Sequence, residues 1–150
     1  MAERSQDWLA QAKRDLDSAK SQRENGFYEW ATFIAQQAAE KACKAVLQKF
    51  GGEAWGHVAS KLLKAIENHA ETESGLQDAA LYLDKFYIPA RYPNGWGEGK
   101  PADFITEGDA ANAIDNSEKI IRFCEGFFLK SDVIEKKSHE NNTQTEQGET

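Results

Sequence analysis

Apolar residues recur at helical spacing through the first third of the chain. A thin apolar stripe runs along residues 4–25, at Trp8, Ala12, Leu16 and Ala19. These spacings place the stripe on one face of an α-helix, and the dipeptide Asn25-Gly26 predicts its end. Residues 27–50 contain no glycine or proline and are apolar over a much wider arc. We therefore expect a central helix that several neighbours bury, ended by Gly51-Gly52.

Three further segments show the same periodicity. They are residues 57–70, residues 76–88 and the segment that follows Gly108. The last segment has the cleanest stripe, formed by Ala110, Ile114, Ser117, Ile121, Cys124 and Phe128. No segment of useful length alternates with the period of two that marks a strand. The pattern predicts an all-α fold, an up-and-down bundle of four to five helices.

One long segment between the fourth and the last helical stripe breaks the pattern. Pro89 and Pro93 forbid regular helix there, because proline clashes with the preceding turn and lacks an N–H. The segment runs on to Glu107 and carries Arg91, Tyr92 and Trp96. Loops of more than about a dozen residues in compact domains tend to be functional or disordered, and this one is too aromatic for simple disorder. We expect it to display these three side chains beside the bundle.

The composition changes after residue 130. Lys, Glu, Asn, Gln, Thr and Ser dominate there, and apolar residues stop after Ile134. We interpret residues 1–130 as one helical domain and residues 131–150 as a disordered polar tail.

Charge and cysteine content narrow the function classes. The 150 residues carry a formal net charge of −7, which argues against general attraction to RNA or to an anionic membrane. No apolar run of about 18 residues predicts a membrane span, and the first residues do not resemble a secretion signal. Cys43 and Cys124 fall in apolar helical stripes, as expected for reduced core cysteines. The predicted location is cytoplasmic.

No cofactor or metal motif is present. The chain lacks a phosphate-binding glycine loop and the Glu-x-x-His pairs of a di-iron bundle. Of the three histidines, His57 is the most informative, because it opens a predicted helix and Lys61 lies one turn further on the same face. This pair is either a packing and capping feature or a polar pair that faces a groove.

Several motifs in order resemble the HEPN family. An early "AKRDLDSA" helix is followed by "QQAAEKACKAVL" from Gln36 to Leu47, then by "HVASKLL" from His57 to Leu63 and by "RYPN" from Arg91 to Asn94. The resemblance covers residues 5 to 130. It implies an up-and-down helical bundle, often a symmetric dimer, found mainly in prokaryotes and frequently encoded beside a small nucleotidyltransferase partner, as in toxin–antitoxin pairs.

The resemblance also indicates which motif a catalytic member of the family would carry. Some HEPN members cut RNA without a metal and carry Arg-x4-6-His, but no arginine of this chain has a histidine at that spacing. The nearest match is Lys64 with His69, and lysine lacks the forked guanidinium that clamps a phosphate. We therefore favour a protein that is not an enzyme, without catalytic residues.

The resulting hypothesis is a dimeric module that binds a nucleotide or another phosphate-bearing ligand and works with a nucleotidyltransferase partner. The candidate ligand-binding residues are His57, Lys61, Arg91, Tyr92 and Trp96. Two other functions stay open: a ribonuclease toxin with a degenerate site made of His57 and Arg91, and a pure dimerisation scaffold. In a structural reading of the same residues, Arg91 pairs with Glu98, Asp103 or another acid, and Tyr92 and Trp96 cap the open end of the core. Whether His57 and Arg91 meet is left open.

Overall fold

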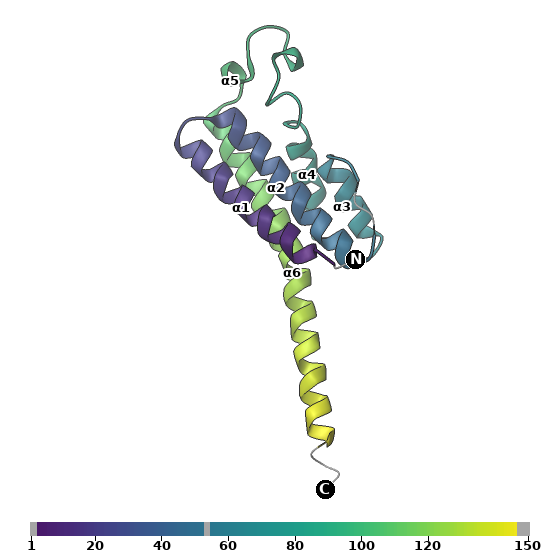
Figure 1. The fold of residues 1–150 in the computed structure, drawn as a ribbon. Coiled ribbons are helices and arrows are strands. Elements are labelled where there is room, and N and C mark those ends of the chain that lie inside the picture. Colours follow the sequence, from purple (N-terminus) through teal and green to yellow (C-terminus); the bar gives the residue numbers. More distant parts are fainter. Residues whose placement is uncertain (1–2, 53–54, 147–150) are drawn as a thin grey trace.

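The regular structure of the chain is entirely helical in the part that is described. The computed structural model describes residues 3–52 and 55–146, with side chains up to Leu129 (Figure 1). Its helices are α1 (Ser5–Glu24), α2 (Tyr28–Lys49), α3 (Ala59–Glu67), α4 (Leu76–Asp84), α5 (Pro101–Phe104) and α6 (Glu107–Glu146). A short 3₁₀ turn, Pro93–Gly95, precedes α5. The predicted all-α bundle is confirmed.

The two predicted glycine stops end α1 and α2 in the same way. Gly26 has a φ of 81°, and the N–H of Phe27 donates to the carbonyl of Gln22 at 2.9 Å. Gly51 has a φ of 78°, and the N–H of Gly52 donates to the carbonyl of Leu47 at 3.0 Å. Both are Schellman ends, in which a left-handed residue lets the chain turn while the last carbonyls keep their partners.

Helix α2 is the centre of the bundle, as its wide apolar arc predicts. It contacts each of the other α-helices, and Figure 1 shows it between α1 on one side and α3 and α4 on the other. Its fully buried positions are mostly alanines: Ala31, Ala35, Ala38, Ala39, Ala42 and Ala45. Small side chains along one helix let neighbouring backbones come close, so α2 can be surrounded on several sides.

The stripe predicted after Gly108 is the buried face of α6. All six of its residues are buried, from Ala110 to Phe128. Cys124 on α6 and Cys43 on α2 are both free and fully buried, which confirms that they are core residues. This packing of α6 on α2 closes the bundle.

Two helices are shorter than the periodicity predicts. Helix α3 begins at Ala59, so His57 lies in the connection before it instead of opening the helix. Helix α4 ends at Asp84, and the chain continues through turns in which Phe86 and Arg91 donate to carbonyls three residues back. Such turns preserve the side-chain pattern of a helix for a few residues, which explains why the stripe continues to Tyr87.

The last helix continues beyond the predicted domain boundary. Helix α6 is assigned to Glu146 and projects away from the bundle in Figure 1. Residues 147–150 lie outside the described residues, and the side chains of residues 130–146 are not described. The disordered tail at 131–150 stays a prediction.

Candidate functional site

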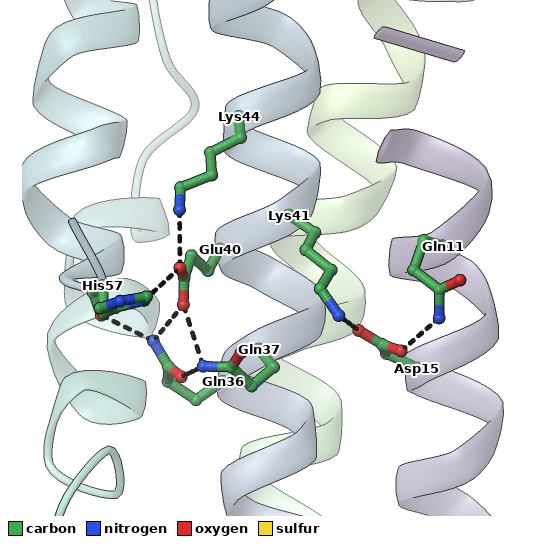
Figure 2. Close-up of polar contacts among 8 residues, drawn as sticks. All are labelled: Gln11, Asp15, Gln36, Gln37, Glu40, Lys41, Lys44 and His57. Atoms are coloured by element: carbon green, nitrogen blue, oxygen red, sulfur yellow. Dashed lines mark hydrogen bonds and ion pairs between the residues drawn. The ribbon is translucent and has the colours of Figure 1, made fainter. Parts of the chain in front are cut away.

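A carboxylate buried in the middle of α2 organises one side of the bundle. Glu40 is only 3% exposed and lies between Ala39 and Lys41, with alanines on the adjoining turns. A buried charge is costly unless it is paired and fully hydrogen-bonded. The surroundings of Glu40 meet that condition, as Figure 2 shows.

Four side-chain nitrogens surround the Glu40 carboxylate. Lys44 Nζ lies 2.9 Å and His57 Nδ1 lies 2.7 Å from Oε1. Gln37 Nε2 and Gln36 Nε2 donate to Oε2 at 3.0 Å and 3.4 Å. Three of these four residues come from the same stretch of α2, and His57 arrives from the connection to α3 (Figure 2).

The same network fixes residue 57 at two points. The His57 ring binds Glu40, and Gln36 Nε2 donates to the backbone carbonyl of His57 at 2.9 Å. Gln37 Nε2 in turn donates to Gln36 Oε1 at 2.8 Å, which orients the Gln36 amide. The His57 backbone and the His57 ring are therefore both attached to α2. A separate contact in Figure 2, in which Lys41 and Gln11 bind Asp15, joins α2 to α1.

The His57 ring faces outward and lies against Tyr87. Its side chain is 55% exposed, and its ring stacks on Tyr87 with centroids 5.0 Å apart and planes 16° apart. The Arg91 guanidinium lies over the same Tyr87 ring, with Cζ 4.5 Å from the centroid. The structure therefore brings His57 and Arg91 to one aromatic residue, which sequence reasoning left open.

Arg91 is held by aromatic rings and a backbone carbonyl. Its Cζ lies 4.5 Å from the centroid of Phe33 and 5.1 Å from that of Tyr92, and its Nε donates to the carbonyl of Tyr87 at 2.8 Å. We refer to Phe33, His57, Tyr87, Arg91 and Tyr92 as the Tyr87 cluster. Face-on packing of a guanidinium against rings leaves its edge, which carries the N–H groups, available.

No carboxylate of the described residues pairs with Arg91. Asp103, one of the two acids considered as its partner, instead accepts a bond from Lys100 Nζ at 2.8 Å. This hydrogen bond from Lys100 lowers the pKa of the Asp103 carboxyl. Within the described part of the chain, Glu98 forms no ion pair with Arg91 either, so the pairing expected in the structural reading is wrong.

Of the remaining candidate residues, Tyr92, Trp96 and Lys61, only one belongs to the Tyr87 cluster. Tyr92 is 49% exposed and belongs to the cluster. Trp96 does not: its Nε1 donates to the carbonyl of Pro89 at 2.7 Å and its ring stacks on Phe104 at 4.7 Å. Trp96 therefore braces the loop by its contacts with Pro89 and Phe104. Lys61 is exposed, and its side chain forms no hydrogen bond or ion pair with another described residue.

Sequence reasoning missed Glu40 and Tyr87 as parts of this arrangement. Glu40 could have been noticed in the sequence, because it is an acidic residue close to Ala39 and Ala42 on the helix with the widest apolar arc. Tyr87 had none, because it completes an ordinary helical stripe. Only the path of the chain shows that its ring contacts both His57 and Arg91.

Neither a metal-binding cluster nor a membrane-spanning helix is found among the described residues. No group of three or more His, Cys, Asp or Glu side chains there is placed to hold a metal ion. Among the same residues, no helix has the length and apolar character needed to cross a membrane.

Comparison with protein families now identifies the fold. The sequence model of the HEPN domain matches residues 5–127, which is most of the chain. The chain belongs to the HEPN family. The match includes every residue of the Tyr87 cluster and Glu40, so the site lies within the HEPN domain.

Solved structures agree with this assignment. TT1696 from Thermus thermophilus is 40% identical with a TM-score of 0.81, and the alignment covers 83% of this chain and 98% of that one. ST0689, an archaeal HEPN homologue, is 39% identical with a TM-score of 0.71 over 83% and 98%. A HEPN domain protein from Thermotoga maritima, tm0613, is 37% identical with a TM-score of 0.67 over 81% and 97%. A search of the curated proteins found no match.

Proposed function

We propose that this HEPN domain binds a nucleotide or a closely related phosphate-bearing ligand at the Tyr87 cluster, without catalysing a reaction. The observation that carries the proposal is Arg91, a guanidinium that no described carboxylate neutralises and that three rings and one carbonyl hold in place. An oriented guanidinium can bind phosphate oxygens through two parallel N–H bonds. Because its position is already fixed, little conformational entropy is lost on binding.

Tyr92 supplies the second feature of a nucleotide site. Its ring is half exposed and lies beside Arg91, so a base can stack on the ring while the phosphate reaches the guanidinium. The net charge of −7 does not oppose this proposal, because a single oriented cation acts locally.

Titration calorimetry with ATP tests the proposal. Wild type should bind, and Arg91→Lys should weaken binding roughly 10- to 100-fold, because lysine keeps the charge but loses the forked pair of donors. Arg14→Ala on the exposed side of α1 is the matched control and should bind like wild type. Absence of binding at millimolar ATP in wild type, or equal affinity in Arg91→Lys, would contradict the proposal.

The expected partners belong to the same proposal. Membership of the HEPN family supports a homodimer that works with a small nucleotidyltransferase. Exposed apolar side chains near the cluster, Trp30 and Ile88, offer contact area for a second subunit. Light scattering tests the dimer, which a monomer mass at micromolar concentration would exclude. Co-expression with a neighbouring nucleotidyltransferase and co-purification test the partner.

A ribonuclease is the second candidate, because His57 and Arg91 contact the same ring and His57 is bound to a carboxylate. This arrangement could supply a proton-transfer group and a charge-stabilising group. Incubation with RNA distinguishes the two functions. Cleavage by wild type that is lost in both His57→Ala and Arg91→Ala would favour the ribonuclease, whereas intact RNA would support the binding module.

A further inference from the structure

The hydrogen bonds around Glu40 determine where the His57 ring carries its proton. Lys44 and His57 both approach Oε1, while the two glutamine amides occupy Oε2. A carboxylate that receives an ammonium and two amide donors is ionised, because a proton on either oxygen would compete with a donor already there. An ionised carboxylate can only accept, so His57 Nδ1 must carry hydrogen.

The opposite nitrogen of the ring is therefore an acceptor whenever His57 is neutral. A neutral imidazole has one N–H, and with hydrogen on Nδ1 the lone pair is on Nε2. The side chain is 55% exposed and no bond from a described residue involves Nε2. The Tyr87 cluster thus combines a fixed acceptor at His57 with fixed donors at Arg91.

We propose that this acceptor selects ligands that carry a hydroxyl group beside the phosphate, so that the ligand class is ribonucleotides over forms whose sugar lacks the 2′- and 3′-hydroxyl groups. The inference rests on the proposed nucleotide site. A deprotonated phosphate oxygen cannot donate to Nε2, whereas a ribose hydroxyl can. His57 stacks on the Tyr87 ring and Arg91 lies over the same ring, so the proposal places the sugar and the phosphate of one nucleotide across Tyr87. Glu40 acts in this scheme as a positioning residue.

Calorimetry with matched ligands tests the selection. At pH 8.5, wild type should bind ATP roughly three- to tenfold more tightly than 2′,3′-dideoxy-ATP, the effect of one hydrogen bond. His57→Phe keeps a ring to stack on Tyr87 but lacks Nε2, so this ratio should fall to about one. His69→Phe is the control, since His69 stacks on Phe50 with centroids 4.8 Å apart and lies outside the cluster. It should preserve the wild-type ratio.

The outcomes separate this inference from the proposed function. Binding that depends on Arg91 but treats ATP and 2′,3′-dideoxy-ATP alike would overturn the selection and leave the nucleotide site in place. No binding of either ligand would overturn both. Inosine triphosphate tests the other donor of ATP, which is the amine of the base. If inosine triphosphate binds more weakly than ATP while the dideoxy ligand binds equally well, then the donor to His57 is the base and the ribose assignment is wrong.

A spectroscopic measurement covers the case in which His57→Phe fails to fold. Long-range proton–nitrogen NMR of the wild-type protein at pH 8.5 should show His57 with hydrogen on Nδ1 and a lone pair on Nε2. A wild-type ring with hydrogen on Nε2 would overturn the inference without any ligand.

Discussion

Glu40 is more costly to remove than any one of its four partners. All of them point their donors at its two oxygens, so its loss takes this acceptor from Lys44 and His57. Gln36 and Gln37 lose one bond each but keep their bonds to the His57 carbonyl and to Gln36 Oε1. Lys44 is itself largely buried, and its charge would then have no compensation from Glu40. Loss of one member of a buried pair is far more destabilising than loss of both.

Two variants test this asymmetry. Glu40→Leu should lower the free energy of unfolding by about 3–5 kcal/mol, while the double variant Glu40→Leu/Lys44→Met should recover at least about 1 kcal/mol of that loss. Urea unfolding followed by circular dichroism measures both. Lys20→Ala breaks the partly exposed pair with Glu118 and should change stability by no more than about 1 kcal/mol. A double variant less stable than Glu40→Leu would show that Lys44 is compensated by other groups.

Sequence reasoning named three residues of this arrangement and missed Glu40 and Tyr87. Arg91, Tyr92 and His57 were recognisable by their chemistry. The contact between His57 and Glu40 was not, because it joins residues 17 positions apart and depends on how the connection after Gly51 folds back along α2. Hydrophobic periodicity carries no information on the path of such a connection.

The element that carries Arg91 is a loop made rigid by local packing. Trp96 is joined to Pro89 by a hydrogen bond and to Phe104 by stacking, so the start and the end of the loop are held by one side chain. The prolines predicted that helix stops there, and the structure adds α5 and a 3₁₀ turn within the same segment. These short elements have too few residues to show a period.

Glycine substitutions test how tightly the loop is packed. A Cβ on Gly95 would lie 3.0 Å from the Pro89 Cα, a backbone atom that cannot move independently, so Gly95→Ala should cost about 1–3 kcal/mol. Gly97 has no atom within 4 Å of the same added carbon, so Gly97→Ala should be neutral or slightly stabilising. Thermal unfolding compares the two, and limited proteolysis shows whether the loop opens. Equal stability of both variants would mean that the loop shifts freely to accept the methyl group.

The helices themselves were the most predictable elements. Stripes on α1, α2 and α6 correspond to buried faces because these helices are long and each packs a continuous face. The shorter α3 and α4 were predicted with extra residues, since turns at their ends imitate the helical pattern. Helix caps, which no hydrophobic pattern records, decide these boundaries.

At the scale of the whole molecule, the two buried cysteines lie where α2 packs on α6. A hydrogen bond with Cys43, together with complete burial, raises the pKa of the Cys124 thiol well above its ordinary value. Burial, followed by the negative charge of Asp109, raises the pKa of Tyr82 on α4. In both cases the folded chain holds the proton more tightly than the unfolded chain does.

Stability should therefore fall as pH rises through the alkaline range. Above about pH 8.5 the unfolded chain begins to lose the Cys124 proton while the folded chain keeps it, so the free energy of unfolding decreases. Tyr82 adds to the decrease above about pH 10. Urea unfolding from pH 8 to 10.5 should show this slope, and Cys124→Ala should reduce it even though its stability at pH 8 is lower. An unchanged slope in Cys124→Ala would assign the alkaline loss to other groups.

Residue 57 is attached to α2 twice, once through its backbone carbonyl and once through its side chain. Gln36 binds the carbonyl that every amino acid has at this position, whereas Glu40 binds only the imidazole. The backbone can therefore keep its course when the side chain is exchanged. A designer could therefore install a different recognition group at position 57 without rebuilding the connection between α2 and α3.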